Sequence, residues 1–136
     1  MDKIRDIVLS NAYNLAGIVN GLYEFKLKEL EEADPSRKYD KEEVIGISKT
    51  VASDIKTQRS RPTRKSIVSL CIYCGLEPQY SEIVIAAAGY HLSLSYAVDE
   101  AYYKLIHEHY KGGIKAANKK LKEWGISSKD YLLDYN

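Results

Sequence analysis

Hydrophobic residues recur every three or four positions along almost the whole chain, and this period predicts helices. Short stretches that contain glycine or proline separate the periodic segments, at 33–36, 46–48, 58–62, 75–78, 111–113 and 125–127. β-branched residues that favour strands, such as Ile67 and Val68, fall inside longer segments with the helical period. We therefore expect an all-α fold without strands.

The first 34 residues carry an apolar stripe whose steps alternate between four and three, which is heptad spacing. We expect one long helix or two abutting helices over 2–33, with a bend at Gly17 and Gly21, because each glycine weakens a helix by about 1 kcal/mol. The stripe either packs on the rest of the domain or forms a dimer seam in which its one polar member fixes the register. Its members are Ile4, Val8, Asn11, Leu15, Ile18, Leu22 and Phe25.

We divide the chain into an N-terminal helix at 1–34 and a helix-turn-helix domain with a C-terminal helical extension at 35–136. Pro35 marks the break between them. Ser48 is the expected N-cap of one helix and Gly75 the expected C-cap of another, while Ser93 to Ser95 offer caps for a third. The expected helices in this part cover about 39–45, 49–57, 62–74, 80–88, 93–110 and 114–124, with a short one after Ser127.

The net charge of +1 hides an uneven distribution. Between Ser48 and Lys65 there are six positive residues and one negative residue, so this stretch carries +5 and the remainder of the chain carries −4. A local basic stripe on an otherwise acidic molecule favours oriented contact with a polyanion. The chain has no apolar run long enough to span a bilayer and no signal-peptide pattern, so we expect a cytoplasmic protein that does not act at a membrane.

Catalytic patterns are missing from the sequence, which has no glycine-rich phosphate loop, no G-x-S-x-G and no recognisable acid pair. We therefore expect no enzyme activity and no cofactor. Cys71 and Cys74 form a C-x-x-C, which is compatible either with packing in the core or with a metal or redox site. The chain has twelve tyrosines and one phenylalanine; they either pack at the core margin or form an aromatic surface for a protein partner.

The segment from Gly46 to Leu76 carries the chemistry that we consider functional. It predicts two helices that meet at a tight turn at Gly46, the second of which buries Ala52 and Ile55. The opposite face of that second helix is polar, and a basic loop follows it. A helix with an exposed polar first turn fits the DNA major groove, which is about 12 Å wide.

This segment resembles the lambda-repressor-like, or XRE-type, family of helix-turn-helix proteins, as a diverged bacterial member. The matching residues are the turn glycine Gly46, the Ile47-Ser48 pair, the core positions Ala52 and Ile55, Pro62, and the next helix's Ile67, Leu70 and Cys71. The stretch from Ile83 to Leu92 is also similar to a bacterial branch of the family. Two positions depart from the pattern: Gln58 replaces a glycine, and Lys41-Glu42 replaces an apolar pair in the first helix of the motif.

The resemblance implies a transcriptional regulator, often a repressor, of a bacterium or mobile element. Together with the charge pattern it assigns base contacts to Lys49, Thr50, Ser53 and Asp54. Phosphate contacts are assigned to Ser48, Lys56, Arg59, Arg61 and Arg64. The expected partners are double-stranded DNA and a second copy of the chain in a homodimer. The alternative is a protein-interaction module that retains the fold without operator binding.

Overall fold

The computed structural model describes residues 2–135, and over that span it contains eight α-helices, one 3-10 turn and no strand. The all-α prediction is therefore confirmed. No helix within 2–135 combines the length and the apolar character that crossing a membrane requires. The helices are α1 (Lys3–Ser10), α2 (Leu15–Ala33), α3 (Lys41–Ile45), α4 (Lys49–Thr57), α5 (Arg64–Tyr73), α6 (Pro78–Ala87), α7 (Ala97–Glu108) and α8 (Gly113–Glu123), and the 3-10 turn is Ser128–Asp130.

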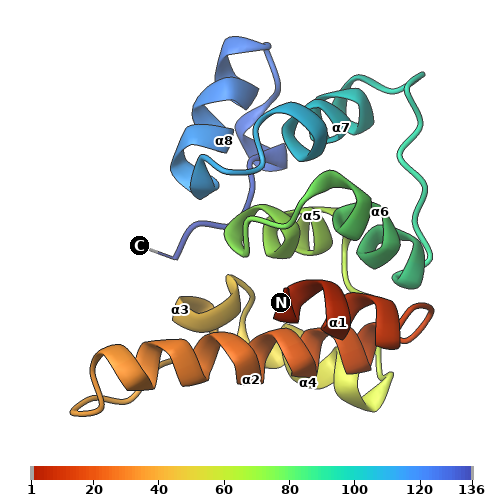
Figure 1. The fold of residues 1–136 in the computed structure, drawn as a ribbon. Helices are drawn as coiled ribbons and strands as arrows, with labels where there is room; N and C mark the ends of the chain where they lie inside the picture. The colour runs from red at the N-terminus through yellow and green to blue at the C-terminus, as the bar shows by residue number, and fades with distance from the viewer. Residues whose placement is uncertain (1, 136) are drawn as a thin grey trace.

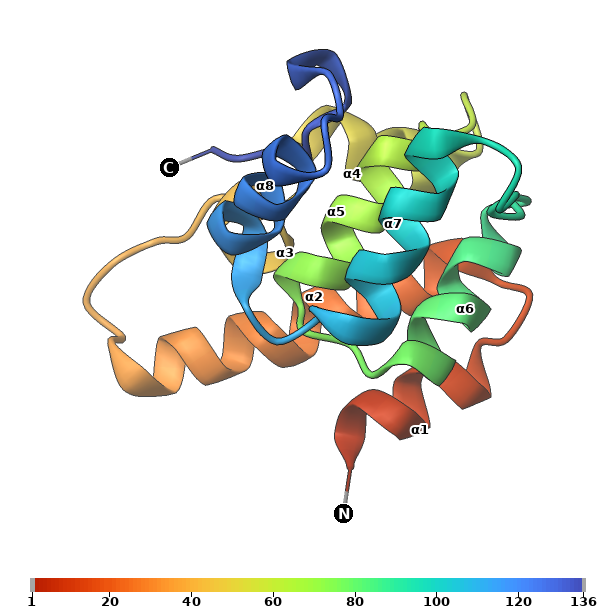
Figure 2. The same cartoon turned by 90° about the horizontal axis from the view of Figure 1, so that it is seen from above.

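The helices form three layers, with α5 and α6 in the middle (Figure 1). Helices α1 to α4 lie on one side of this pair, and α7 and α8 lie on the other (Figures 1 and 2). Helix α5 is the centre, because seven consecutive residues from Ser66 to Ile72 are buried. A helix that is buried all round needs neighbours on every side. Residues from the N-terminal helices and from the C-terminal extension share one hydrophobic core.

The C-terminal segment closes the core beside α5 and α8. The Ser69 hydroxyl donates to the Lys65 carbonyl at 2.7 Å and accepts the amide of Leu133 at 3.0 Å. The Asn118 side chain forms two hydrogen bonds with the backbone of Leu132, accepting from its amide at 2.7 Å and donating to its carbonyl at 3.0 Å. These bonds satisfy polar groups that would otherwise be buried without partners.

The N-terminal segment forms two helices, one of the two expected arrangements, but the predicted bend at Gly17 and Gly21 is wrong. The chain breaks at 11–14, where Tyr13 has a φ of 74° and Asn14 caps α2 by accepting the amide of Gly17. Helix α2 continues through Gly17 and Gly21, and the missing side chain at Gly21 lets α1 pack against it, since a Cβ there would lie 2.7 Å from Ile7 Cγ2. The two helices therefore fold back on each other and do not form one continuous heptad stripe.

The apolar stripe is used for packing within the chain. Val8, Ile18 and Leu22 are completely buried in one chain, so these positions are already covered. A dimer seam built on them would need the α1–α2 pair to come apart.

Helix α7 begins later than expected, at Ala97 in place of the 93–95 region. The Asp99 carboxylate accepts the amide of Ser93 at 2.9 Å and lies 3.5 Å from the guanidinium of Arg64. These two contacts hold the preceding segment as an irregular loop on the outside of the molecule (Figure 1). The serines therefore do not cap α7.

Tyrosines connect separate elements of the fold. The hydroxyls of Tyr73, Tyr90 and Tyr102 donate to the carbonyls of Glu43, Pro62 and Asp130, respectively. Burial raises the pKa of Tyr102 above its usual value. These three residues agree with the first of the two expectations for the tyrosines, packing at the margin of the core. The exposed tyrosines among the described residues come from separate segments: Tyr13 from the α1–α2 turn, Tyr96 from the loop before α7, Tyr103 from α7 and Tyr135 from the C-terminal segment.

The turn between α3 and α4 gives a test of the local geometry. Gly46 has a φ of 76°, and a Cβ at this position would lie 2.5 Å from Tyr73 Cγ. Gly125 has a similar φ of 78° and open space around it. We expect Gly46→Ala to lower the free energy of unfolding by about 2–4 kcal/mol, and Gly125→Ala by about 1 kcal/mol, since only Gly46 adds a steric clash to the dihedral cost. Urea denaturation measures both, and equal losses would contradict the packing of Tyr73 on Gly46.

Candidate nucleic-acid interface

Helices α3 and α4 are joined by a turn of three residues, as the sequence predicts. Gly46 ends α3 in the left-handed conformation, and Ile47 is buried. The Ser48 hydroxyl accepts the amide of Val51 at 3.1 Å and so begins α4. The turn fixes the direction of α4 relative to α3.

Helix α4 has a buried and an exposed face. Ala52 and Ile55 are buried and anchor the helix to the core. On the outside, Lys49, Thr50 and Ser53 are exposed together with Lys56. The helix therefore presents cations and hydroxyls to solvent while its apolar face supports it from behind.

Of the four residues predicted to contact bases, Asp54 differs from the others. Lys49, Thr50 and Ser53 are exposed, whereas Asp54 is half-buried. Its carboxylate accepts the hydroxyl of Ser60 at 3.2 Å. Asp54 therefore holds the loop that follows α4 close to the helix.

The loop after α4 begins with a conformation that favours glycine. Gln58 ends α4 with a φ of 56°, in the left-handed region, at the position where the resemblance expects glycine. Its amide donates to the Ile55 carbonyl at 3.3 Å, and the amide of Arg59 donates to the Asp54 carbonyl at 3.0 Å. The turn is therefore kept without the glycine.

The residues predicted to contact phosphates divide into two groups. Lys56 and Arg59 are exposed, and Ser48 caps α4. Arg61 and Arg64 are exposed as well, but both have partners within the chain: Arg61 donates to the carbonyls of Ala88 and Gly89 at the end of α6. Arg61 and Arg64 also lie on the ring of Tyr90, 3.9 and 4.9 Å from its centroid. These two arginines thus have a structural role that the sequence did not reveal.

A groove of about 650 Å³ runs between α2 and α4. Lys41, at the start of α3, lies on its edge with its ammonium 3.3 Å from the centroid of the Tyr23 ring. Burial and the nearby charges of Lys56 and Lys49 lower the pKa of Lys41. The groove is lined by Asn14, Ala16, Gly17, Val19, Asn20, Tyr23, Glu24, Lys41, Lys49, Ala52, Ser53, Ile55 and Lys56.

The three lysines make the groove a place where a bound anion would relieve repulsion between like charges. Sequence reasoning missed Lys41 because alignment placed it at a core position of the first helix of the motif. Its helical phase gave no signal either, because Val44 and Ile45, three and four residues further along α3, are buried on the same face.

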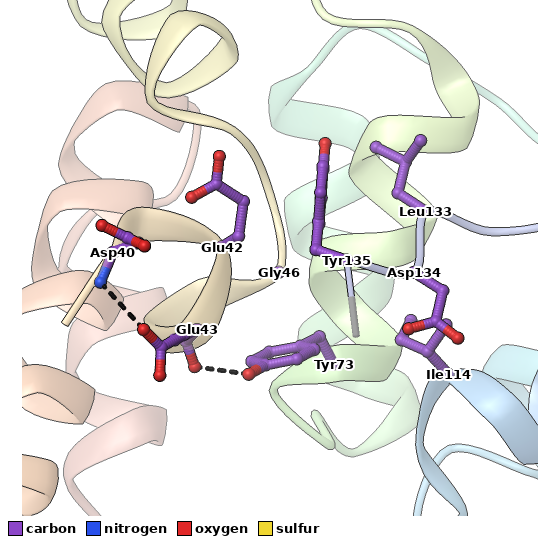
Figure 3. A pocket seen from close by; sticks show the side chains of 9 residues that line it. All are labelled: Asp40, Glu42, Glu43, Gly46, Tyr73, Ile114, Leu133, Asp134 and Tyr135. Carbon is purple, nitrogen blue, oxygen red and sulfur yellow. Dashed lines mark hydrogen bonds between the residues drawn. The ribbon is translucent and has the colours of Figure 1, made fainter.

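The other side of α3 is acidic. A pocket of about 440 Å³ lies between α3 and the C-terminal segment, with Asp40, Glu42, Glu43 and Asp134 among its lining residues (Figure 3). A hydrogen bond from the backbone amide of Asp40 and the nearby Arg37 guanidinium lower the pKa of Glu43. Helix α3 therefore separates a cationic groove from an anionic pocket, and a polyanion would be directed to the α4 side.

Comparison with models of known families, with curated proteins and with solved structures gives no match. The relation to lambda-repressor-like proteins therefore stays a prediction from the residues named above. Function has to be inferred from the geometry of the interface.

The two cysteines belong to the core. Cys71 and Cys74 are both buried and unpaired, and burial raises the pKa of each thiol to about 12. A thiolate is the species that binds metals and attacks disulfides, so burial opposes both roles at neutral pH. Among residues 2–135 no group of three or more histidine, cysteine or acidic residues is arranged to hold a metal ion.

This burial predicts slow thiol chemistry. In the native chain at pH 8 we expect both thiols to resist an aromatic disulfide reagent, because both are buried and burial raises their pKa to about 12. In urea, both thiols of the same chain should react with the reagent at once. Rapid reaction of either thiol in the native chain would contradict the structure.

The two loop arginines provide a matched pair for stability. Arg61→Ala removes hydrogen bonds to the end of α6 and a contact with Tyr90, so we expect a loss of about 1–3 kcal/mol in the free energy of unfolding. Arg59→Ala removes an exposed side chain and should change stability by less than about 0.5 kcal/mol. Thermal or urea unfolding compares the two, and equal effects would argue against the structural role of Arg61.

Proposed function

We propose that this protein binds duplex DNA by placing α4 in the major groove. The observation that carries the proposal is the exposed face of α4, where Lys49, Thr50 and Ser53 point outward from a helix anchored by Ala52 and Ile55. Helix α4 has nine residues and its first turn is open to solvent. These features meet the requirements of a helix that reads base edges.

The side chains divide into two roles. Lys49, Thr50 and Ser53 face base edges, and Lys56 and Arg59 hold the phosphates beside them, together with Lys41 from the α2–α4 groove. Asp54 and Arg61 hold the loop after α4 and so position Arg59 for its phosphate contact. Arg64 is committed to Asp99 and Tyr90.

We infer a regulator of transcription that acts on a bacterial or mobile-element operator. A single helix of this length reads only a few base pairs, so useful affinity requires two copies on a two-fold site. The dimer would use a surface other than the buried face of α1 and α2. This role belongs to the cytoplasm.

The second candidate is a protein-interaction module. It is favoured by the internal contacts of Arg61 and Arg64, which reduce the cations available to phosphates, and by the presence of Glu24 in the groove. DNA binding is preferred because the lysines on and beside α4 outnumber that single carboxylate. The experiment below separates the two.

Binding should depend on salt and on the lysines of α4. We expect the chain to bind random duplex at low salt. The Lys49→Gln, Lys56→Gln double variant should reduce the slope of log K against log salt by about 1, since Lys56 is the phosphate contact of this pair and each such contact contributes about 0.9. Fluorescence anisotropy at several salt concentrations measures the slope.

The control carries Lys3→Gln and Lys28→Gln, which remove the same charge from exposed positions outside the interface. If the two double variants behave alike, α4 is not the contact surface. If the unmodified chain binds no duplex at low salt, the protein-interaction module is the better assignment.

A further inference from the structure

A second basic surface lies on α8, outside the interface described above. Between Lys111 and Lys129 the chain has six lysines and one acidic residue, Glu123, a net charge of +5. This equals the charge of the stretch from Ser48 to Lys65. Since the whole chain carries only +1, positive charge is concentrated in two places.

The fold collects the α8 charges on one face. Ile114, Ala117 and Leu121 are buried against the core. The exposed side carries Lys115, Lys119 and Lys122, at the i, i+4, i+7 spacing of a helix face. Lys115 pairs with Asp134 at 2.9 Å and remains 71% exposed in its side chain. Across residues 2–135 no ion pair is formed by Lys111, Lys119 or Lys122.

Aromatic residues lie beside this face. A hollow of about 390 Å³ at the start of α8 is lined by His109, Tyr110, Lys111 and Lys120, with Glu108 as its one carboxylate. The ring of His109 lies 5.7 Å from that of Trp124, and the Lys104 ammonium lies 5.4 Å from the Trp124 centroid. Lysine, tyrosine and histidine side chains are suited to phosphate and sugar contacts.

Helices α4 and α8 lie in opposite outer layers, with α5 between them (Figures 1 and 2). A duplex on α4 would have to bend sharply around the domain to reach α8. Duplex DNA resists such bending, because its persistence length is about 150 base pairs. One straight duplex therefore does not serve both surfaces.

We propose that the lysine face of α8 holds the backbone of a second duplex segment, so that one chain bridges two pieces of DNA. The inference rests on the proposed function of α4. Contacts through lysines to phosphates carry no sequence information, so α8 accepts any duplex while α4 selects its site.

The test is a bridging assay with the full chain. One duplex is fixed to beads, and recovery of a second, labelled duplex is measured. The Lys115→Gln, Lys119→Gln, Lys122→Gln variant should recover at least about ten-fold less of the second duplex, while its affinity for one duplex at the α4 interface changes by less than about three-fold. The matched control is Lys3→Gln, Lys28→Gln, Lys38→Gln, and thermal melting confirms that both variants fold.

The outcomes separate the two proposals. Equal recovery by the α8 variant and the control overturns bridging through α8 and leaves the function of α4 intact. Loss of all duplex binding in the α8 variant, with retention in the Lys49→Gln, Lys56→Gln variant, overturns the assignment of α4 as well as bridging. If the unmodified chain binds phosphatidylserine vesicles through the α8 lysines and recovers no second duplex, α8 is a membrane-contact surface and the inference is wrong.

Discussion

The burial of α5 on every side is the constraint on which the rest of the structure depends. Seven consecutive residues of α5 are buried, so other helices must cover it on every side. Helices α6, α7 and α8 pack on it directly, and Tyr73 at its end bonds to Glu43 in the α1–α4 layer. The two buried serines in this run are accommodated because each finds a local partner, Ser66 with Thr63 and Ser69 with Lys65. A central helix of this kind fixes the outer layers relative to each other, and so keeps α4 and α8 apart.

Charge is sorted by the same arrangement. A chain with a net charge of +1 would attract a polyanion weakly if its charges were mixed evenly. Instead, α3 turns Lys41 toward α4 while Glu42 and Glu43 line the pocket on its other side. The local field at α4 is therefore set by a few lysines, and the acidic pocket lies on the opposite side of α3. The near-neutral net charge thus conceals a cationic groove and an acidic pocket on opposite sides of α3.

Local rules predicted much of the fold. Ser48 as a cap and Gly46 as a turn follow from hydrogen bonding and dihedral freedom within a few residues, and the outward face of α4 follows from its period. Predictions failed where contacts between residues that are distant in sequence determine the position of a side chain. The partners of Arg61 lie 27 and 28 residues away in sequence, and Asp99 meets both Arg64 and Ser93. No spacing rule reveals such pairs, and for the same reason Lys41 was not recognised beside Lys49 and Lys56.

The residues that turned out to have internal partners still matter to the candidate interface. The loop after α4 begins with backbone hydrogen bonds from Gln58 and Arg59 to the end of α4, and at its far end Ser60 is held by Asp54 and Arg61 by the end of α6. Arg59, between the left-handed Gln58 and Ser60, is exposed on a segment whose backbone is already ordered. A phosphate that binds Arg59 would then pay little of the entropy that ordering a free loop requires. The strain of a left-handed glutamine at this corner is a modest cost for a loop that stays in one conformation. In this scheme Arg61 and the half-buried Asp54 would position Arg59 for the phosphate contact that we propose for it.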